Sequence, residues 1–514
     1  SIIIPHDPQV AMTVPHGDFR GHLVIPHEVD HTKVMRNLGY EVPSPILTTY
    51  DWSHQTPFES QKHTAAMLTL SRRAYVLSQM GVGKTAAALF AFDYLRQVGE
   101  AHRMLVVAPL STLNVVWAHE VFKRFPHLET SVLYGSREQR RKALDQDAAI
   151  YLLNHDGVKV FCTKKRRKKA IVWELGPELR ERTDIDVVLI DELAIYRNAR
   201  TDRWKTANEL IKGRKWAWGM TGGPTPKEPT DAWAQVRLLT PNNVSWSFRS
   251  FRDETMSQVS QFKWVPKKGS LERVHRAMQP SVRYTREECL DLPPTTYSQR
   301  EVEMSAEQAR AYQQMQEKFT VRHPAGTVTA MNAGVQMGKL LQVATGFLYN
   351  GKEVLPLDHT PRIKVMREVI EEADAKVIVF VPFKQGIELV ERGLDGHYTY
   401  ASVTGDTPKK KRDEIFNAFQ HLPTPQVLVA HPKVAAHGLT LTRANTILWY
   451  TIYPDLEIYE QACSRVARPG QKLHTHIINL VSSRVEQRVA KVLQERGNLQ
   501  KALLDLFTNV EGEL

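Results

Sequence analysis

The chain has 514 residues, too long for a single hydrophobic core, so about two to four domains are expected. The formal net charge of +12 and the pI of about 9.4 suit a polyanion partner such as nucleic acid, although solubility alone also accounts for a basic balance. Three cysteines without metal-ligand spacing exclude a disulfide framework, and no apolar run is long enough to span a membrane.

The first fifty residues differ from the rest of the chain. They carry three Pro-His turns, followed by a short helix that ends near Gly39. We expect residues 1–50 to form a small accessory module. Its histidines could suggest a metal site, but no cysteine or helical spacing accompanies them, so we interpret them as ordinary surface residues and expect no metal finger: His6, His16, His22, His27 and His31.

Short apolar runs then alternate with helical patterns, which predicts an α/β fold with parallel sheets. Expected strands of the first half are 103–109, 149–154, 187–191 and 216–222. Expected strands of the second half are 376–383, 398–405, 426–432, 446–452 and 476–481. These groups predict two α/β lobes, at 51–240 and 351–481. Residues 241–350 are expected to form a mostly helical insertion and linker, and residues 482–514 to form helices that brace the second lobe.

A glycine-rich segment, MGVGKT, lies between a short expected strand and a helix rich in Ala and Leu. Gly81 and Gly83 allow backbone N–H groups to close around phosphate oxygens, and the helix N-terminus adds its positive end. Lys84 is predicted to reach the β- and γ-phosphates, and the Thr85 hydroxyl to bind Mg²⁺. A chance glycine-rich turn is the alternative, and Ser78 stands where such loops usually start with Gly or Ala.

Two acids, Asp191 and Glu192, end the apolar run VVLID. Ligands in α/β proteins bind at the carboxyl ends of parallel strands. Taken alone, these acids could be a helix N-cap. Because they follow the glycine-rich segment by about a hundred residues, Asp191 is predicted to hold Mg²⁺ and Glu192 to orient or deprotonate the attacking water.

A pair of arginines, Arg465 and Arg468, occurs in EQACSRVARPGQ near the end of the second lobe. On a helix, residues three apart face one side, so the pair could clamp a γ-phosphate as an arginine finger does. Solvent-facing salt bridges are the alternative for such a pair.

Together these segments resemble the Swi/Snf family of ATP-dependent DNA translocases in helicase superfamily two. The resemblance runs from about residue 55 to 490. In the first lobe it rests on TPFESQKHTAAML, MGVGKT, LVVAPLSTLNVVWAHE, LIDELAIYRN and MTGGPTPKEPTDAWAQVRLLTP. In the second lobe it rests on KVIVFVPF, SVTGDTPKKKRDEIFNAF, AAHGLTLTRANTILWY and QACSRVARPGQ.

The resemblance implies two RecA-like lobes with ATP held between them, Arg465 and Arg468 coming from the second. Glu192, Lys84 and the two arginines are the implied catalytic residues. The implied ATP-binding residues are Gln61, Gly81, Val82, Gly83, Lys84, Thr85, Ala86 and Gly438. Gln61 is expected near the adenine, and the cofactor is Mg²⁺ on Thr85 and Asp191. DNA contacts are expected from Ser111, Thr112, Thr221, Thr404, Lys164, Lys165, Arg166 and Arg167.

The chain departs from the family pattern at several places. The family usually has His after Asp-Glu-Ala, where this chain has Leu193 and Ala194. In the coupling motif, Gly223 replaces Thr and Lys227 replaces Asn, and Thr440 replaces Asn before the arginine segment. We expect these changes to leave ATP hydrolysis intact. We expect them to affect how tightly hydrolysis is coupled to DNA.

A basic run, KKRRKK at 164–169, lies between two first-lobe motifs. Because six like charges repel, we expect a loop there. A DNA clamp, a solvated loop and a nuclear-localisation patch are all open for it. The segment KWVPKKG at 263–269 is a second candidate DNA contact.

The function predicted from these residues is a DNA-dependent ATPase that translocates on double-stranded DNA and remodels it by fork reversal, branch migration or protein displacement. A strand-separating helicase on single-stranded DNA or RNA and a nucleotide-gated DNA clamp are the alternatives. We expect a monomer that binds double-stranded or branched DNA and no membrane. Its expected location is the cytoplasm of a bacterial or phage-infected cell, or the nucleus if it is eukaryotic.

Overall fold

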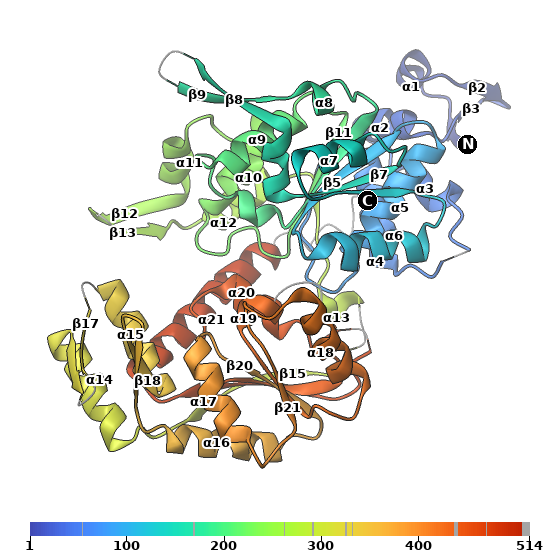
Figure 1. Ribbon diagram of the computed structural model, residues 1–514. Helices are drawn as coiled ribbons and strands as arrows, with labels where there is room; N and C mark the ends of the chain where they lie inside the picture. The colour runs from blue at the N-terminus through green and yellow to red at the C-terminus, as the bar shows by residue number, and fades with distance from the viewer. Residues whose placement is uncertain are drawn as a thin grey trace. The chain divides into compact units, whose positions relative to one another are not determined.

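The computed structural model describes residues 1–53, 55–167, 170–261, 263–289, 292–323, 326–330, 333–435, 440–468 and 470–505. The chain divides into two compact units, formed mainly by residues 1–289 and 290–498 (Figure 1). Each unit is described by itself below. Among the described residues, no helix is both long and apolar enough to cross a membrane.

The first unit is built on a seven-stranded sheet in which every neighbouring pair of strands is parallel. In order across the sheet, its strands are β14 (Ser281–Val282), β4 (Arg73–Val76), β11 (Trp216–Met220), β10 (Ile185–Asp191), β5 (Arg103–Ala108), β7 (Ile150–Asn154) and β6 (Thr130–Leu133). The expected strands at 103–109, 149–154, 187–191 and 216–222 are therefore confirmed. Their runs of Val, Ile and Leu are buried on both faces, as strands of a covered parallel sheet require.

Helices cover both faces of this sheet. One face carries α4 (Glu59–Leu70), α5 (Lys84–Gln97), the π-helical segment η1 (Leu113–Ala118) and α6 (His119–Arg124). The other face carries α7 (Arg137–Leu144), the 3₁₀ segment η2 (His155–Phe161), α8 (Pro177–Arg180), α9 (Asp202–Ile211), α10 (Asp231–Leu239), α11 (Phe248–Thr255) and α12 (Ser270–Ala277). Successive strand residues alternate between the two cores, so the sheet is the centre of a three-layer α/β lobe.

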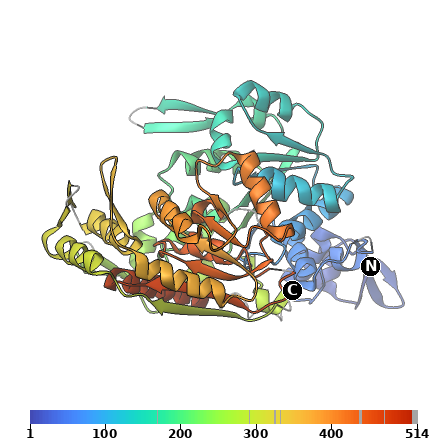
Figure 2. The same cartoon turned by 60° about the horizontal axis from the view of Figure 1, so that its bottom comes forward.

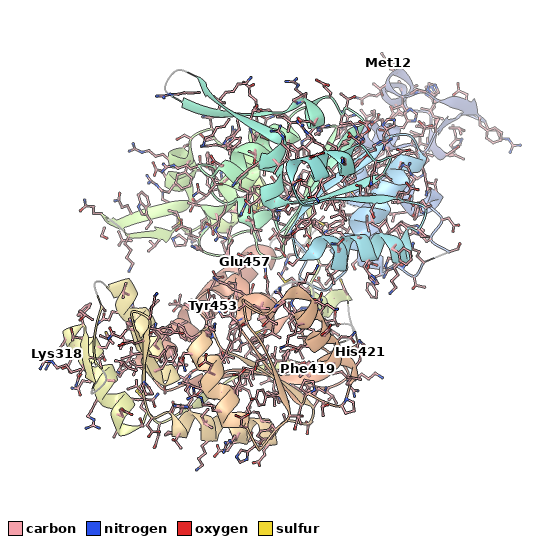
Figure 3. All side chains as sticks on the ribbon, in the orientation of Figure 1. Met12, Lys318, Phe419, His421, Tyr453 and Glu457 are labelled. Atoms are coloured by element: carbon pink, nitrogen blue, oxygen red, sulfur yellow. The ribbon has the colours of Figure 1, made fainter. Side chains whose placement is uncertain are left out.

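The N-terminal residues form a small module with its own apolar core. It consists of β1 (Ile2–Pro5), α1 (Pro8–Thr13), β2 (Gly17–Phe19), β3 (His22–Ile25) and α2 (Val29–Asn37), and α3 (Pro45–Thr49) follows it. The strands form an antiparallel sheet in the order β1-β3-β2, and Asp7 caps α1 while accepting a hydrogen bond from Tyr40. Met12 on α1 is 88% exposed (Figure 3).

The second unit is built on a six-stranded parallel sheet. Its strand order is β15 (Thr295–Glu301), β24 (Thr475–Val481), β23 (Ala444–Trp449), β20 (Lys376–Phe380), β22 (Val427–Ala430) and β21 (Tyr400–Val403). The covering helices are α16 (Thr360–Glu371) and α17 (Lys384–Leu394) on one face, and α18 (Lys409–His421) and α20 (Leu456–Cys463) on the other. Phe419 of α18 (Figure 3) is fully buried against the sheet. All five strands expected in this half are confirmed.

The segment 241–350 contains strands as well as the helices of the expected insertion. Besides its helices, it supplies β14 to the first sheet and β15 to the second, so the two units divide after residue 289. It also forms the antiparallel hairpins β12 (Met256–Ser260) with β13 (Lys263–Pro266) and β16 (Thr320–His323) with β17 (Gly326–Thr329). Its remaining helices are η4 (Pro241–Asn243), α13 (Arg286–Cys289), α14 (Ala306–Lys318) and α15 (Ala333–Thr345).

The last elements complete the second unit. A short hairpin, β18 (Phe347–Asn350) and β19 (Glu353–Pro356), follows α15, and α19 (Pro432–Ala435) follows β22. The long helix α21 (Arg484–Asp505) packs on α20 through Val489, Ala490 and Leu493. At its base the buried Glu486 pairs with the buried Arg362 of α16 at 2.6 Å.

Candidate nucleotide-binding site

The phosphate loop joins β4 to α5 and has the backbone that the glycine-rich segment predicts. Gly81 and Gly83 have φ values of 91° and 80°, in the left-handed region that favours glycine. A Cβ added at Gly83 would lie 2.0 Å from Gln61 Nε2, so a larger residue would displace the Gln61 side chain and would also be strained by the positive φ. The side chains of Val82 and Ala86 are buried, so these predicted ATP-binding residues would act through their backbone.

Lys84 lies at the first position of α5 and turns back into the loop. Its Nζ donates to the carbonyl oxygens of Ser78 at 2.8 Å and Gln79 at 3.0 Å. The loop therefore holds a cation among acceptor groups at a helix N-terminus, an arrangement suited to an incoming phosphate. Thr85 follows on the first helical turn and is partly exposed.

Gln61 of α4 contacts the same loop. Its Oε1 accepts from Phe58 N at 2.9 Å, and its Nε2 donates to the Gly83 carbonyl at 3.2 Å. The side chain is 4% exposed and thus fixed against the loop. The structure thereby brings Gln61 and the phosphate loop together, and the adenine contact of Gln61 stays a prediction.

The two acids lie where the sequence predicts them, at the carboxyl end of β10. Asp191 Oδ2 accepts from the Trp117 indole Nε1 at 3.1 Å, and its Oδ1 accepts from Glu192 N at 3.0 Å. Burial raises the pKa of Asp191, while the hydrogen bond from Trp117 and the charge of Lys84 act to lower it. The Lys84 cation thus acts electrostatically on Asp191, as a shared nucleotide site requires.

Glu192 has an unusual backbone for a residue with a side chain. Its φ of 53° and ψ of 53° lie in the left-handed region, which is uncommon and costly outside glycine. Such strain clusters at functional sites because the surrounding structure holds it in place. Here Glu192 lies directly between the end of β10 and the 3₁₀ segment η3 (Leu193–Tyr196), so regular structure holds its backbone on both sides.

Trp117 is a site residue that the sequence motifs do not single out. It is fully buried in η1, and its indole N–H is the donor to Asp191. A buried indole needs an acceptor for its N–H, but no motif spacing links Trp117 to an acid 74 residues later in the chain, so the sequence carried no signal for this contact. The π-helical form of η1 agrees with this role, because π-helical turns often occur at functional sites.

The coupling motif packs against the phosphate loop. Thr221 follows β11, and its N donates to the Val76 carbonyl at 3.0 Å. A Cβ at the next residue, Gly222, would lie 3.7 Å from the Ser78 carbonyl oxygen. The expectation that Thr221 contacts DNA is not met, because the side chain is 2% exposed and its hydroxyl accepts from Gly223 N at 3.3 Å.

The segment 109–120 contains two predicted DNA contacts, Ser111 and Thr112, and only one of them is exposed. Ser111 is exposed and available to a phosphate. Thr112 is 9% exposed, and both its hydroxyl, at 2.9 Å, and its N–H, at 3.0 Å, donate to the Pro109 carbonyl. A direct phosphate contact from Thr112 is therefore corrected to a role in shaping the turn that presents Ser111.

Ser78, which departs from the usual loop pattern, has a structural partner. Its hydroxyl accepts from Tyr284 N at 3.0 Å, and Gln79 N donates to the Tyr284 carbonyl at 2.9 Å. A glycine or alanine could not make the first of these bonds. The serine therefore ties the phosphate loop to the strand segment that follows β14.

In the second unit, the arginine pair lies on a turn rather than on a helix. Helix α20 ends at Cys463, which corrects the expected helical placement of Arg465 and Arg468. Arg465 is 4% exposed, and its Nε donates to the Gln461 carbonyl at 3.0 Å. Arg468 is more exposed; its Nε donates to the Ser464 carbonyl at 3.0 Å and its Nη1 to the Thr440 hydroxyl at 3.4 Å. These backbone carbonyls, not a helical register, set the direction of the pair.

Two further second-unit predictions fall nearby in the sequence. Gly438, predicted to bind ATP, lies outside the described residues. Thr404 follows β21 and is partly exposed; its N donates to the Thr407 hydroxyl at 2.9 Å, and its own hydroxyl accepts from Asp406 N at 3.3 Å. The turn that carries Thr404 is therefore ordered by its own threonines.

The basic run forms a β-hairpin, which corrects the expected loop. Strands β8 (Cys162–Arg167) and β9 (Ala170–Leu175) pair antiparallel, and the hairpin extends from the first unit in Figures 1 and 2 while its base packs into the first-unit core. Strand alternation places Lys164 and Lys165 on opposite faces, where Trp173 and Asp202 meet Lys164 and Glu174 meets Lys165 at 2.6 Å. Arg166 is exposed, and Lys168 and Lys169 lie outside the described residues.

Comparison with known proteins decides the family. Residues 66–350 match the SNF2-related domain, and residues 361–470 match the helicase conserved C-terminal domain. The chain belongs to the SNF2 family. It is thus an ATP hydrolase and a member of a helicase family that binds DNA, with one parallel-sheet unit under each of the two matched domains.

Named SNF2 relatives include phage and bacterial proteins. Protein p41 of Acyrthosiphon pisum secondary endosymbiont phage 1 is 23% identical over 85% of this chain and 94% of its own length. "Uncharacterized ATP-dependent helicase MG018" of Mycoplasma genitalium is 23% identical over 83% of this chain and 40% of its own length. The chain thus spans less than half of the Mycoplasma protein. The solved Sulfolobus solfataricus SWI2/SNF2 ATPase core in complex with dsDNA is 21% identical, with a TM-score of 0.40, over 88% of this chain and 94% of that one.

Proposed function

We propose that this SNF2 protein is a DNA-dependent ATPase that translocates on double-stranded DNA and remodels it, by fork reversal, branch migration or displacement of bound proteins. The observation that carries the proposal is the convergence on one sheet edge of Lys84, Asp191 and the strained Glu192, which would form the first-lobe half of a nucleotide-hydrolysis site. The match of residues 361–470 to the helicase C-terminal domain supports a second lobe that would supply the other half, with Arg465 and Arg468.

The residues of the first lobe fit ATP with Mg²⁺. A cradle closed by Gly83 and a half-buried carboxylate on which the Lys84 charge acts suit a phosphate and a hard cation. Asp191 and the Thr85 hydroxyl would hold Mg²⁺, which neutralises charge on the β- and γ-phosphate oxygens when bound. Lys84 would exchange the Ser78 and Gln79 carbonyls for phosphate oxygens, and Glu192 would orient or deprotonate the attacking water.

The second lobe would supply Arg465 and Arg468 to the γ-phosphate. Arg468 suits this role better, because its side chain is less buried than that of Arg465. Buried Arg465 would then hold the turn that aims Arg468. Motion between the lobes during the ATP cycle would drive translocation.

DNA would be held through its phosphates. Ser111 and Thr404 are the accessible hydroxyl groups among the predicted contacts, and the β8–β9 hairpin adds Lys164, Lys165, Arg166 and Arg167. Phosphate contacts carry no base information, so we expect binding that tolerates sequence and weakens steeply with salt. We propose that the protein acts as a monomer in the cytoplasm, and that residues 1–50 form an accessory module.

An ATPase assay without nucleic acid, and with duplex DNA, single-stranded DNA or RNA, tests the proposal. Duplex DNA should stimulate hydrolysis most, and Lys84→Ala should abolish the activity in every condition. Stimulation by single strands or RNA alone would indicate a strand-separating helicase. ATP binding without stimulated hydrolysis would indicate a nucleotide-gated clamp.

A further inference from the structure

An exposed tryptophan lies on the first unit at the turn before α11. Trp246 is 81% exposed, and the guanidinium carbon of Arg237 lies 3.9 Å from the centre of its ring. Arg237 in turn donates to the Pro241 carbonyl at 3.2 Å. The cation therefore covers and orients one face of the indole, and the exposure leaves the rest of the ring surface open to solvent.

A second arginine–tryptophan stack lies in the next elements along the chain. Arg252 of α11 places its guanidinium carbon 3.9 Å from the ring centre of Trp264, on the β12–β13 hairpin. This hairpin extends from the first unit beside α11 in Figure 1. Lys263, Lys267 and Lys268 are exposed around Trp264. Two arginine–tryptophan stacks, one on a largely exposed ring and one on a partly exposed ring, thus occur within residues 237–264.

A cationic hollow adjoins the Trp246 turn. It has a volume of ≈ 660 Å³ and is lined by Asn243, Arg273, Arg276, Gln279 and Pro280. Asn243 Nδ2 fixes it by donating to the carbonyls of Ala277 at 3.1 Å and Gln279 at 2.9 Å. Arg273 pairs with Glu254 at 2.6 Å, whereas no ion pair to the exposed Arg276 occurs among the described residues. Arg276 is therefore available for an anion.

The charge of the whole segment supports a polyanion ligand. Residues 241–280 contain seven Lys and Arg but only three Asp and Glu. Alternating cations and open aromatic rings are the combination that binds single-stranded nucleic acid, because cations hold phosphates and unpaired bases stack on the rings. Bases in a duplex are stacked on each other and cannot reach such a ring without unstacking.

We propose that the surface formed by Arg237, Trp246, Trp264 and Arg276 binds a single-stranded DNA arm next to a duplex, with a base on Trp246 and a phosphate at Arg276. This proposal deepens the proposed function, on which it rests, by naming the DNA structure: a branched or tailed duplex rather than an uninterrupted one. None of these residues belongs to the nucleotide-binding site.

Fluorescence anisotropy with labelled DNA tests the proposal. The probes are a blunt duplex and the same duplex with a single-stranded arm of about ten nucleotides. Trp246→Ala should weaken binding of the tailed duplex by about tenfold and leave the blunt duplex unchanged, because base–aromatic stacking is lost only with the former. Trp246→Phe should retain most of the affinity. Phe19→Ala is a matched control, because Phe19 is 56% exposed with Arg20 5.2 Å from its ring, and it should change neither.

Equal losses on both probes would overturn the proposal in favour of duplex binding, and no loss on either would show that Trp246 does not touch DNA. For the tailed probe, Arg276→Ser should reduce the slope of log affinity against log salt concentration by about 0.7, the value for one lost phosphate contact. An unchanged slope would show that Arg276 does not contact a phosphate. Duplex-stimulated ATPase activity should be unaffected in Trp246→Ala. If duplex DNA does not stimulate the wild-type protein, the proposed function fails. The anisotropy result would still show whether Trp246 binds the single-stranded arm.

Discussion

In the first unit, Asp191 and Glu192 lie at the carboxyl end of β10, and Lys84 begins the helix that follows β4, two strands away in the same sheet. Hydrogen bonds hold Lys84 to the Ser78 and Gln79 carbonyls and Asp191 to the Trp117 indole. In the second unit, Arg465 and Arg468 lie on a turn after α20 and are directed by hydrogen bonds to nearby backbone carbonyls. The first arrangement is determined by sheet register, which is rigid. The second depends on hydrogen bonds within one short turn after α20.

This difference suits a two-part catalytic site. Groups that bind the nucleotide and metal must be in place beforehand, since preorganised charges avoid reorganisation during reaction. A finger must be able to engage and release the γ-phosphate in each cycle. We therefore expect first-unit mutations to affect nucleotide binding and chemistry, and Arg468 mutations to affect chemistry alone.

The largest effect is expected from Arg468→Ala. Loss of an arginine finger lowers kcat by about 10³-fold or more, because the transition-state charge loses its counter-ion. Nucleotide affinity, measured with a fluorescent ATP analogue, should remain close to that of the wild type. Arg468→Lys is the matched control and should recover only part of the rate, because it keeps the charge but not the two-pronged geometry. Equal loss of affinity and rate would assign Arg468 a structural role instead.

The next largest effect is expected from Glu192→Gln. Loss of a general base costs about 10²- to 10⁴-fold in kcat. Gln keeps the size and the left-handed backbone of Glu192, so thermal unfolding should not change. Steady-state turnover and ATP affinity measured on the same preparation check this. A rate within tenfold of the wild type would exclude Glu192 as the base.

Trp117→Phe should have a moderate effect. It removes the hydrogen bond to Asp191 but leaves the carboxylate and most of the packing in place. Loss of such a supporting contact costs about tenfold or more in metal affinity or activity. The Mg²⁺ concentration needed for half-maximal ATPase activity should rise accordingly. An unchanged Mg²⁺ dependence would mean that Asp191 does not face the metal.

Ala194→His should change stability more than coupling. The resemblance suggests restoring His at this position, but Ala194 is 1% exposed inside η3. An imidazole there would overpack the core, at a cost of about 1–3 kcal/mol in the free energy of unfolding. Chemical denaturation measures this change, and duplex stimulation of ATPase activity should not increase. Tighter stimulation with unchanged stability would show that the pocket accommodates His.

The central strands of both sheets could be predicted from the sequence, and so could the glycine-rich loop and the position of Asp191 at a strand end, whereas the edge strand β6 (Thr130–Leu133) was not expected. Runs of β-branched residues are typical of buried parallel strands. A glycine-rich loop with Gly81 and Gly83, followed later in the chain by an acid such as Asp191 at a strand end, is a specific pattern for a nucleotide site. The edge strands β14 and β15 could not be predicted, because neither contains an apolar run. Strand β14 has only two residues, and β15 is largely exposed. The β8–β9 hairpin was missed because cross-strand partners such as Trp173 and Glu174 outweigh the repulsion within the basic run.

The finer errors arise from tertiary contacts that spacing does not record. Thr112 and Thr221 have residue types suited to phosphate, but the local turns use both hydroxyl groups. Trp117 belongs to a segment expected to contact DNA, yet its indole turns inward to Asp191. Arg465 and Arg468 have helical spacing, but the helix ends before them.

Triplex displacement measured beside unwinding of plain duplex, fork and four-way-junction DNA tests translocation most directly. A protein that moves along duplex DNA should displace a third strand in an ATP-dependent manner and leave a plain duplex unseparated, with both the rate and the ATP dependence lost in Glu192→Gln. Separation of a plain duplex without triplex displacement would contradict translocation and identify a strand-separating helicase.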